Sequence, residues 1–322
     1  MFKFRRYNKT DEKLWDNYVS KSNNGTIFHQ RPFLNYHPEG RFKDHSIIVE
    51  KKQKLYSLFP AVEKKIDNKK YLISHPGSSV GSFVVPESLS ILDSLEIVKQ
   101  LVYYAKNLNF DVIKITLPPT LYQKKLSNYM DFAFFKENFI YINRDITSIL
   151  FLEENIEKNI MKFRSSHRRG VNIAKKKGVI ISESEKYNDY YKILKKNLSK
   201  RHGVKPTHTL EELKKIKSIY NDRIKLFAAF IDGKMIAGVV NFLVNEHVVL
   251  AFYISHDEAF NEYRPLNLLF YEIFSWAIKS NYKIYDFGTF TVNQEPNLGL
   301  GRFKENFGAS GIFRDTIQLN LN

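Results

Sequence analysis

The spacing of apolar and polar residues in the first half of the chain predicts a small α/β module. His45–Glu50 and Leu55–Glu63 alternate in the manner of strands, and a polar turn between them indicates a hairpin. Tyr71–His75 is expected to form a third strand. Apolar residues at helical spacing then predict a helix over Leu89–Leu108, and Phe110–Ile115 reads as a buried strand.

The second half of the chain repeats this order of elements. Ile224–Ile231 and Met235–Val244 are predicted as a hairpin, and Val248–His256 as a third strand. A proline suits the first turn of a helix, so we expect a helix from Pro265 to Ile278. The apolar run Ile284–Phe287 is the buried strand that would follow.

A short identity supports this internal repeat. Both predicted third strands end in the same tripeptide, Ile73-Ser74-His75 and Ile254-Ser255-His256. The chain has 322 residues, which suits two domains of about 150 residues each. We therefore predict an α/β fold with mixed sheets in two domains, residues 1–150 and 151–322.

Composition narrows the possible chemistry. Hydrophobic residues make up 43% of the chain and aromatic residues 15%, enough for two packed cores. Cysteine is absent, so disulfides, thiolate metal sites and a thiol nucleophile are excluded, and no metal site is expected. We see no apolar run long enough to cross a membrane and no signal peptide, and we expect a cytoplasmic protein without a membrane span.

The charge balance favours an anionic partner. The formal net charge is +16, and residues 162–177 contain seven lysines and arginines without an acid. On a helix, Arg164, Arg168, Val171 and Lys175 would share one face. Such a face can bind a diphosphate or an RNA backbone, although a solvated helix face is an equally ordinary explanation.

The C-terminal stretch 284–309 holds the most specific pattern. The strand from Ile284 runs into Asp286 and Gly288, both poor strand formers, and open α/β sheets bind ligands at this end of a strand. Lys304 and Arg302 follow where a short helix could point them back at the strand end. The alternative is a plain strand exit with a glycine turn.

Several motifs resemble the GNAT N-acyltransferases, and in particular their tandem FemABX branch. The segments that carry the resemblance, in chain order, are Gly25–Gln30, Ser165–Arg169 with Ala174–Gly178, Lys200–Gly203, Pro206–His208, Asp286–Gly288, and Phe303–Gly308. The resemblance implies two tandem GNAT-like domains and an acyltransferase that uses acyl-CoA. Two features depart from it: the chain has no coiled-coil arm, and the segment 257–264, DEAFNEYR, lacks the expected glycines.

Acyl transfer to an amine requires a base and donors for the developing oxyanion, and we expect these groups at the two neighbouring strand ends. Each candidate also has a structural explanation, such as a capped turn or a solvated charge. The candidate catalytic residues are Asp286, His256 and His202. The residues expected to bind the acyl-CoA are Arg264, Asn267, Lys304 and Arg302. Those expected to bind the acceptor are Arg168, His208, Tyr253 and Glu305.

The leading hypothesis is an N-acyltransferase that moves an acyl group from acyl-CoA to a nucleotide-linked amino sugar, such as a dTDP-3-amino-3,6-dideoxyhexose, for cell-surface polysaccharide synthesis. An aminoacyl-tRNA-dependent ligase of the FemABX type, acting on a peptidoglycan precursor, is the alternative in which a nucleic acid is a partner. A non-catalytic nucleic-acid-binding protein is a third hypothesis.

Overall fold

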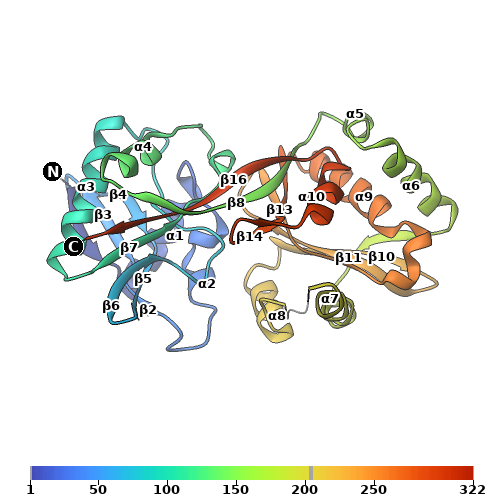
Figure 1. Cartoon of the computed structure of the whole chain (residues 1–322), viewed down its shortest axis with the longest axis horizontal. Coiled ribbons are helices and arrows are strands. Elements are labelled where there is room, and N and C mark those ends of the chain that lie inside the picture. The colour runs from blue at the N-terminus through green and yellow to red at the C-terminus, as the bar shows by residue number, and fades with distance from the viewer. Residues whose placement is uncertain (1, 203–205, 322) are drawn as a thin grey trace. The chain divides into compact units, whose positions relative to one another are not determined.

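The computed structural model describes residues 2–202 and 206–321, without the side chains of 200–202, and it divides the chain into two compact units. Unit 1 comprises Met1–Asp145 and Phe313–Asn322, and unit 2 comprises Ile146–Ile312. The chain passes from one unit to the other in β8 (Ile140–Phe151) and in β16 (Ser310–Asn320) (Figure 1). The division therefore differs from a single boundary at residue 150, because the last ten residues return to unit 1.

Unit 1 contains a mixed sheet and a smaller antiparallel sheet. The strands of the mixed sheet are, in spatial order, β2 (Lys43–Asp44), β5 (Ala61–Ile66), β6 (Lys69–Ser74), β7 (Val112–Thr116) and the end of β16. The strands of the smaller sheet are β1 (Phe2–Arg6), β3 (Ile47–Lys51) and β4 (Lys54–Phe59). The helices are α1 (Glu12–Lys21), α2 (Arg31–Leu34), α3 (Ile91–Asn107) and α4 (Tyr129–Lys136).

One predicted strand of unit 1 was wrong. The segment Leu55–Glu63 is two strands, β4 and β5, which lie in different sheets and are separated by Pro60. Proline has no N–H to donate to a ladder, so a continuous strand at this position is disfavoured. The predicted helix is confirmed as α3, whose N-terminus is capped by the hydroxyl of Ser90. Its apolar face packs on β7.

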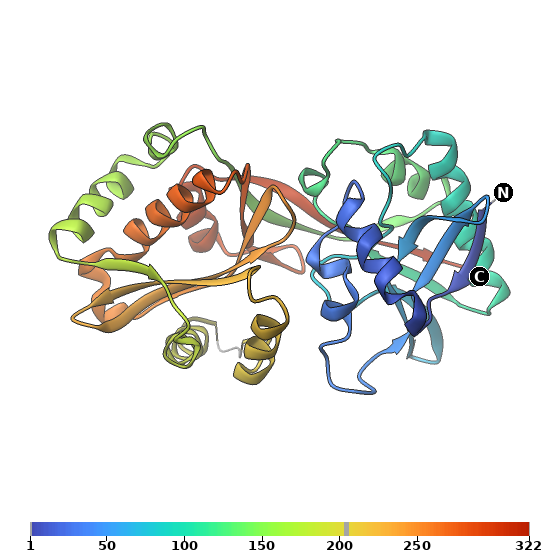
Figure 2. The same cartoon turned by 180° about the vertical axis from the view of Figure 1, so that it is seen from behind.

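Unit 2 is built on a six-strand stretch of sheet. In spatial order its strands are β8, β13 (Ile284–Thr289), β12 (Val248–His256), β11 (Lys234–Leu243), β10 (Ile224–Ile231) and β9 (Ile180–Glu183). Helices α5 (Ile156–Ile160), α6 (Ser165–Lys176) and α9 (Pro265–Lys279) lie on one face, and α7 (Tyr187–His202) and α8 (Leu210–Ile219) on the other (Figures 1 and 2). The short helix α10 (Leu298–Glu305) follows β13. The predicted helix and the four predicted strands of the second half are confirmed, as α9, β10, β11, β12 and β13.

The last part of the repeated order, a strand followed by the main helix and a parallel strand, is confirmed in both units. In each unit a strand pairs in parallel with the strand that follows the main helix: β6 with β7, and β12 with β13. Among the described residues, no helix is long and apolar enough to cross a membrane.

Candidate active site

The strands β12 and β13 separate at their carboxyl ends. Their parallel pairing begins at Val248 and Ile284 and stops at Leu250 and Asp286, whereas β12 continues to His256. A bulge in the β11–β12 ladder places one extra residue, Phe252, on β12 just past this point. The end of the parallel ladder leaves a gap beside β12, the position at which open α/β sheets bind ligands.

A cavity of about 630 Å³ lies at this gap, entirely within unit 2. It is bounded by the end of β12, the N-terminus of α9, α6 and α10. Its polar side chains are His167, Asn197, His256, Asn261, Arg264, Asn267 and Asn297. The cavity therefore lies beside the free end of β12, and its lining comes from β12, α6, α7, α9 and the segment around α10 rather than from β13.

The N-terminus of α9 gives the cavity a site for an anion. The glycine-free segment before it forms a short helix, η4 (Glu258–Tyr263), capped by the side chain of Asp257. Arg264 then adopts a left-handed conformation, with φ of 53°, and Pro265 begins the helix. A fifteen-residue helix carries a partial positive charge at this end, and the exposed Arg264 guanidinium adds a full one. These groups fit a diphosphate despite the missing glycines.

Two histidines border the cavity. His256 Nε2 lies 2.8 Å from Asn261 Oδ1, and because an amide oxygen only accepts, Nε2 carries the hydrogen. In this tautomer the lone pair of the imidazole is on Nδ1, the nitrogen that a general base would use. His167 packs edge-on against Phe307, with ring centroids 4.9 Å apart. Burial, together with the charges of Arg264 and Arg164, lowers the pKa of His167 below 6.5, so this ring is neutral at pH 7.

Asn267 is held at the cavity by the close packing of α6 on α9. Its Nδ2 donates to the carbonyl oxygen of His167 at 3.4 Å. Gly170 permits the approach, because a Cβ at that position would lie 2.7 Å from Asn267 Cγ. A glycine on α6 thus fixes a polar side chain on α9.

Asp286, on β13, and Lys304, on α10, both bond to the end of β13 and do not line the cavity. The fully buried Asp286 accepts hydrogen bonds from Thr147 Oγ1 at 2.5 Å and from the Gly288 N–H at 2.7 Å. Lys304 is 2% exposed, and its Nζ donates to the carbonyl oxygens of Gly288 at 2.6 Å and Thr289 at 2.8 Å. Burial lowers the pKa of Lys304 to about 7.

Other predicted site residues lie apart from the cavity. His208 and Tyr253 bond to each other, with Nδ1 3.0 Å from the tyrosine oxygen, and burial raises the pKa of Tyr253. Arg302 and Glu305 are exposed on α10. Arg168 donates to the Met161 carbonyl at 3.3 Å. The side chain of His202, the last residue of α7, is outside the described residues.

Of the predicted residues, the structure therefore gathers His256, Arg264 and Asn267 at one cavity. His167 and Phe303 were noticed in the sequence only as members of longer motifs, and Asn197 and Asn261 were not singled out. Asn197 reaches the site from α7, where its Nδ2 donates to the His256 carbonyl at 2.9 Å. No local sequence signal marks such a residue, because its role depends on packing between distant segments.

Comparison with known proteins identifies this architecture. Residues 161–305 match the family model described as an acetyltransferase (GNAT) domain. The crystal structure of FemX superposes with a TM-score of 0.76 at 14% identity, covering 99% of this chain and 98% of that one. A tandem GNAT protein from the clavulanic acid biosynthesis pathway gives 0.55 at 8% identity, with 100% and 99% covered.

A third solved structure has the same fold. The C-terminal domain of a putative lysylphosphatidylglycerol synthetase from Agrobacterium fabrum gives a TM-score of 0.59 at 10% identity, covering 98% of this chain and 92% of that one. No curated protein matches the chain in sequence.

Residues 161–305 therefore form a GNAT domain, and the chain as a whole has the fold of tandem GNAT proteins such as FemX. It is an acyltransferase, and the GNAT domain implies acyl-CoA as the acyl donor. This result sets aside the hypothesis of a non-catalytic nucleic-acid-binding protein.

Proposed function

We propose that the protein transfers an acyl group from acyl-CoA to the amino group of a nucleotide-linked amino sugar, and that unit 2 carries the reaction. The observation that supports this proposal is the cavity beside the end of β12, past the point where its pairing with β13 stops, next to Arg264 and the N-terminus of α9. A dTDP-3-amino-3,6-dideoxyhexose is one acceptor of this class, and cell-surface polysaccharide synthesis is the process that would use the product.

The residues of the cavity have separable tasks. The donor, when bound, supplies a thioester carbonyl that an amine can attack. Arg264 and the first turn of α9 would hold the diphosphate of the acyl-CoA, and Asn267 would orient the arm that joins this diphosphate to the thioester. The acceptor nitrogen forms the new amide bond as the carbon–sulfur bond breaks, and its proton has to leave. His256 Nδ1 is our first candidate to take that proton, and neutral His167 is the second.

The basic face of α6 supports an acceptor that carries phosphate. Lys177 pairs with Glu262, and the Lys175 ammonium lies 4.2 Å from the centre of the Tyr271 ring. Arg169 and Lys176 are exposed and make no ion pair with any described residue. These two cations remain available for a nucleotide diphosphate, for which guanidinium groups are well suited.

The same basic face also favours the second candidate, an aminoacyl-tRNA-dependent ligase acting on a peptidoglycan precursor. The two candidates respond differently to salt. A protein that neutralises about six phosphates of an RNA loses on the order of 10³-fold in affinity between 50 and 200 mM salt, whereas a compact nucleotide sugar engages far fewer charges.

The test is a thiol-release assay with a panel of acyl-CoA donors and nucleotide-linked amino sugars. We expect His256→Ala to lower kcat and Arg264→Ala to raise KM for the donor. Lys279→Ala is a matched control, since it removes an exposed cation from the opposite end of α9. Absence of thiol release with every donor, together with transfer from aminoacyl-tRNA, would refute the proposal in favour of the ligase.

A further inference from the structure

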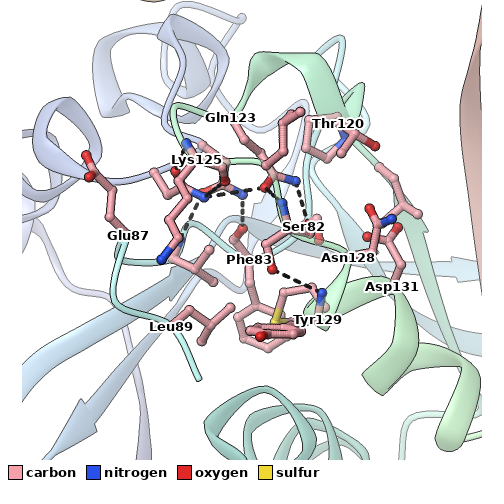
Figure 3. A pocket seen from close by; sticks show the side chains of 18 of the residues that line it. Ser82, Phe83, Glu87, Leu89, Thr120, Gln123, Lys125, Asn128, Tyr129 and Asp131 are labelled. Carbon is pink, nitrogen blue, oxygen red and sulfur yellow. Dashed lines mark hydrogen bonds between the residues drawn. The ribbon is translucent and has the colours of Figure 1, made fainter. Parts of the chain in front are cut away.

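Unit 1 contains a cavity of its own, of about 200 Å³ (Figure 3). It is bounded by the segment after α1 at Asn23, the loop 82–89 between β6 and α3, and the segment 117–134 after β7. In unit 2 the acyl-transfer cavity is likewise lined by the segment between the third strand and the main helix and by the segment after the next strand. The two units thus each have a cavity at corresponding places.

The cavity of unit 1 cannot admit a thioester arm in the way we propose for unit 2. The ends of β6 and β7 are joined, because the Thr116 N–H donates to Ser74 Oγ at 2.9 Å. Gly81 closes the same gap, with its N–H 2.8 Å from the Thr116 carbonyl oxygen. A Cβ on Gly81 would lie 2.4 Å from Ser74 Oγ, so the contact is tight. A ligand of unit 1 must therefore be of another kind.

Amide side chains hold the walls of this cavity in place. Asn23 accepts from the Lys125 N–H at 2.8 Å and donates to the Lys125 carbonyl at 2.9 Å. Gln123 makes the equivalent pair of bonds to Ser127, at 2.9 and 3.1 Å. Asn24 bonds the Phe83 carbonyl at 2.8 Å and the Val85 N–H at 2.9 Å. These reciprocal bonds fix three loop segments, so the cavity is pre-formed.

Asp131 is the polar group at this cavity that most needs a partner. It is partly buried, and among the described residues no side chain donates to its carboxylate. Lys125 and Glu87 lie on the opposite side of the cavity (Figure 3). Burial and the nearby charge of Asp315 raise the pKa of Asp131, as expected of a carboxylate without a cation.

Ser82 adds a second polar group to the lining of the cavity. Its residue is 4% exposed, and its hydroxyl makes no hydrogen bond with any described residue. Its φ of 75° is unusual for a residue other than glycine and costs about 1 kcal/mol or more. A strained serine that presents a hydroxyl at a cavity is a feature expected of a binding site.

We propose that this cavity binds a small protonated amine that also carries hydroxyl groups, with the ammonium group on Asp131 and a hydroxyl on Ser82. A cation would supply the partner that the carboxylate lacks, and charge-assisted hydrogen bonds are the strong ones in such a site. The volume exceeds the roughly 150 Å³ of a cavity that holds benzene, which sets the ligand at about the size of a monosaccharide. This is a second ligand site, independent of the acyl-transfer cavity.

The test compares glucosamine with glucose, which differ at one position by an amino group in place of a hydroxyl. Isothermal titration calorimetry on the full chain, without acyl donor, should show at least tenfold tighter binding of glucosamine. Asp131→Asn should abolish this preference. Glu137→Gln, at the end of the same helix and outside the cavity, makes the same change of charge and should keep it.

Two further variants complete the test. Ser82→Gly removes the hydroxyl while allowing the positive φ, so it should weaken binding of both sugars without loss of stability. Arg264→Ala in unit 2 should leave glucosamine binding unchanged, which separates this site from the proposed acyl-transfer site. Equal affinity for the two sugars, an unchanged preference in Asp131→Asn, or loss of binding in Arg264→Ala would each overturn the proposal.

Discussion

Lys304 provides the sharpest test of the structure of unit 2. Its ammonium is almost fully buried against the turn that ends β13, where it donates to the carbonyl oxygens of Gly288 and Thr289. Burial lowers its pKa from 10.5 to about 7. Between these two values the unfolded chain keeps the proton and the folded chain releases it, so the free energy of unfolding must rise with pH.

The size of the effect follows from the two pKa values. Where only the unfolded chain is protonated, stability rises by about 1.4 kcal/mol per pH unit. Because Lys304 is still half-protonated near pH 7, the gain between pH 7 and pH 9 is about 2 kcal/mol. Lys304→Met removes the titrating group, and therefore the difference in unfolding free energy between the wild type and this variant should grow by that amount over the same range.

Each unit contains one of the two tryptophans, Trp15 in unit 1 and Trp276 in unit 2. A chain of two units need not unfold in one step, so urea unfolding is followed by Trp276 fluorescence in a Trp15→Phe background. Lys176→Met, at an exposed lysine of α6, is the control and should keep the pH dependence of the wild type. If the unfolding free energies of the wild type and Lys304→Met change equally with pH, Lys304 does not have the lowered pKa of a buried lysine, and the prediction is refuted.

Three more outcomes are expected from the acyl-transfer cavity. Arg264→Gly should stabilise unit 2 by about 1 kcal/mol in urea unfolding, because glycine tolerates the left-handed φ, while KM for the donor rises; a loss of stability would contradict the strained conformation. Gly170→Ala should lower the free energy of unfolding by about 1–3 kcal/mol, because the added Cβ would contact Asn267. Adding Asn267→Ala to this variant should restore much of the lost stability. If His167 serves as the base, kcat/KM should fall as the pH drops below the lowered pKa of His167. His167→Gln should then remove this decrease at low pH. An unchanged decrease in the variant argues for His256 as the base.

The secondary structure around the site followed closely from the sequence. The helix predicted to begin at Pro265 does begin there, because a proline at the first position and an apolar residue every three or four positions are local signals. The strand predicted over Val248–His256 has those bounds. Where a local signal was overlooked, the prediction failed: Pro60 divides one expected strand into two.

Candidate residues next to these boundaries were also placed well. His256 ends β12, and Arg264 and Asn267 begin α9, so the same local signals that set the elements brought these side chains to the cavity. The sequence could not show that α6 and α7 contribute His167 and Asn197 to the same cavity, since these helices precede β12 by many residues.

By itself, the sequence determined the order of elements, the internal repeat and the strand ends at which a site had to lie. Only the tertiary structure decided which polar groups face a cavity and which are buried. Asp286 illustrates the distinction, because its carboxylate bonds Thr147, which is 139 positions away, and the turn of Gly288. Helical and strand periodicity can be recognised from residues that are close together in the sequence. The environment of a charged side chain depends instead on which distant segments pack around it.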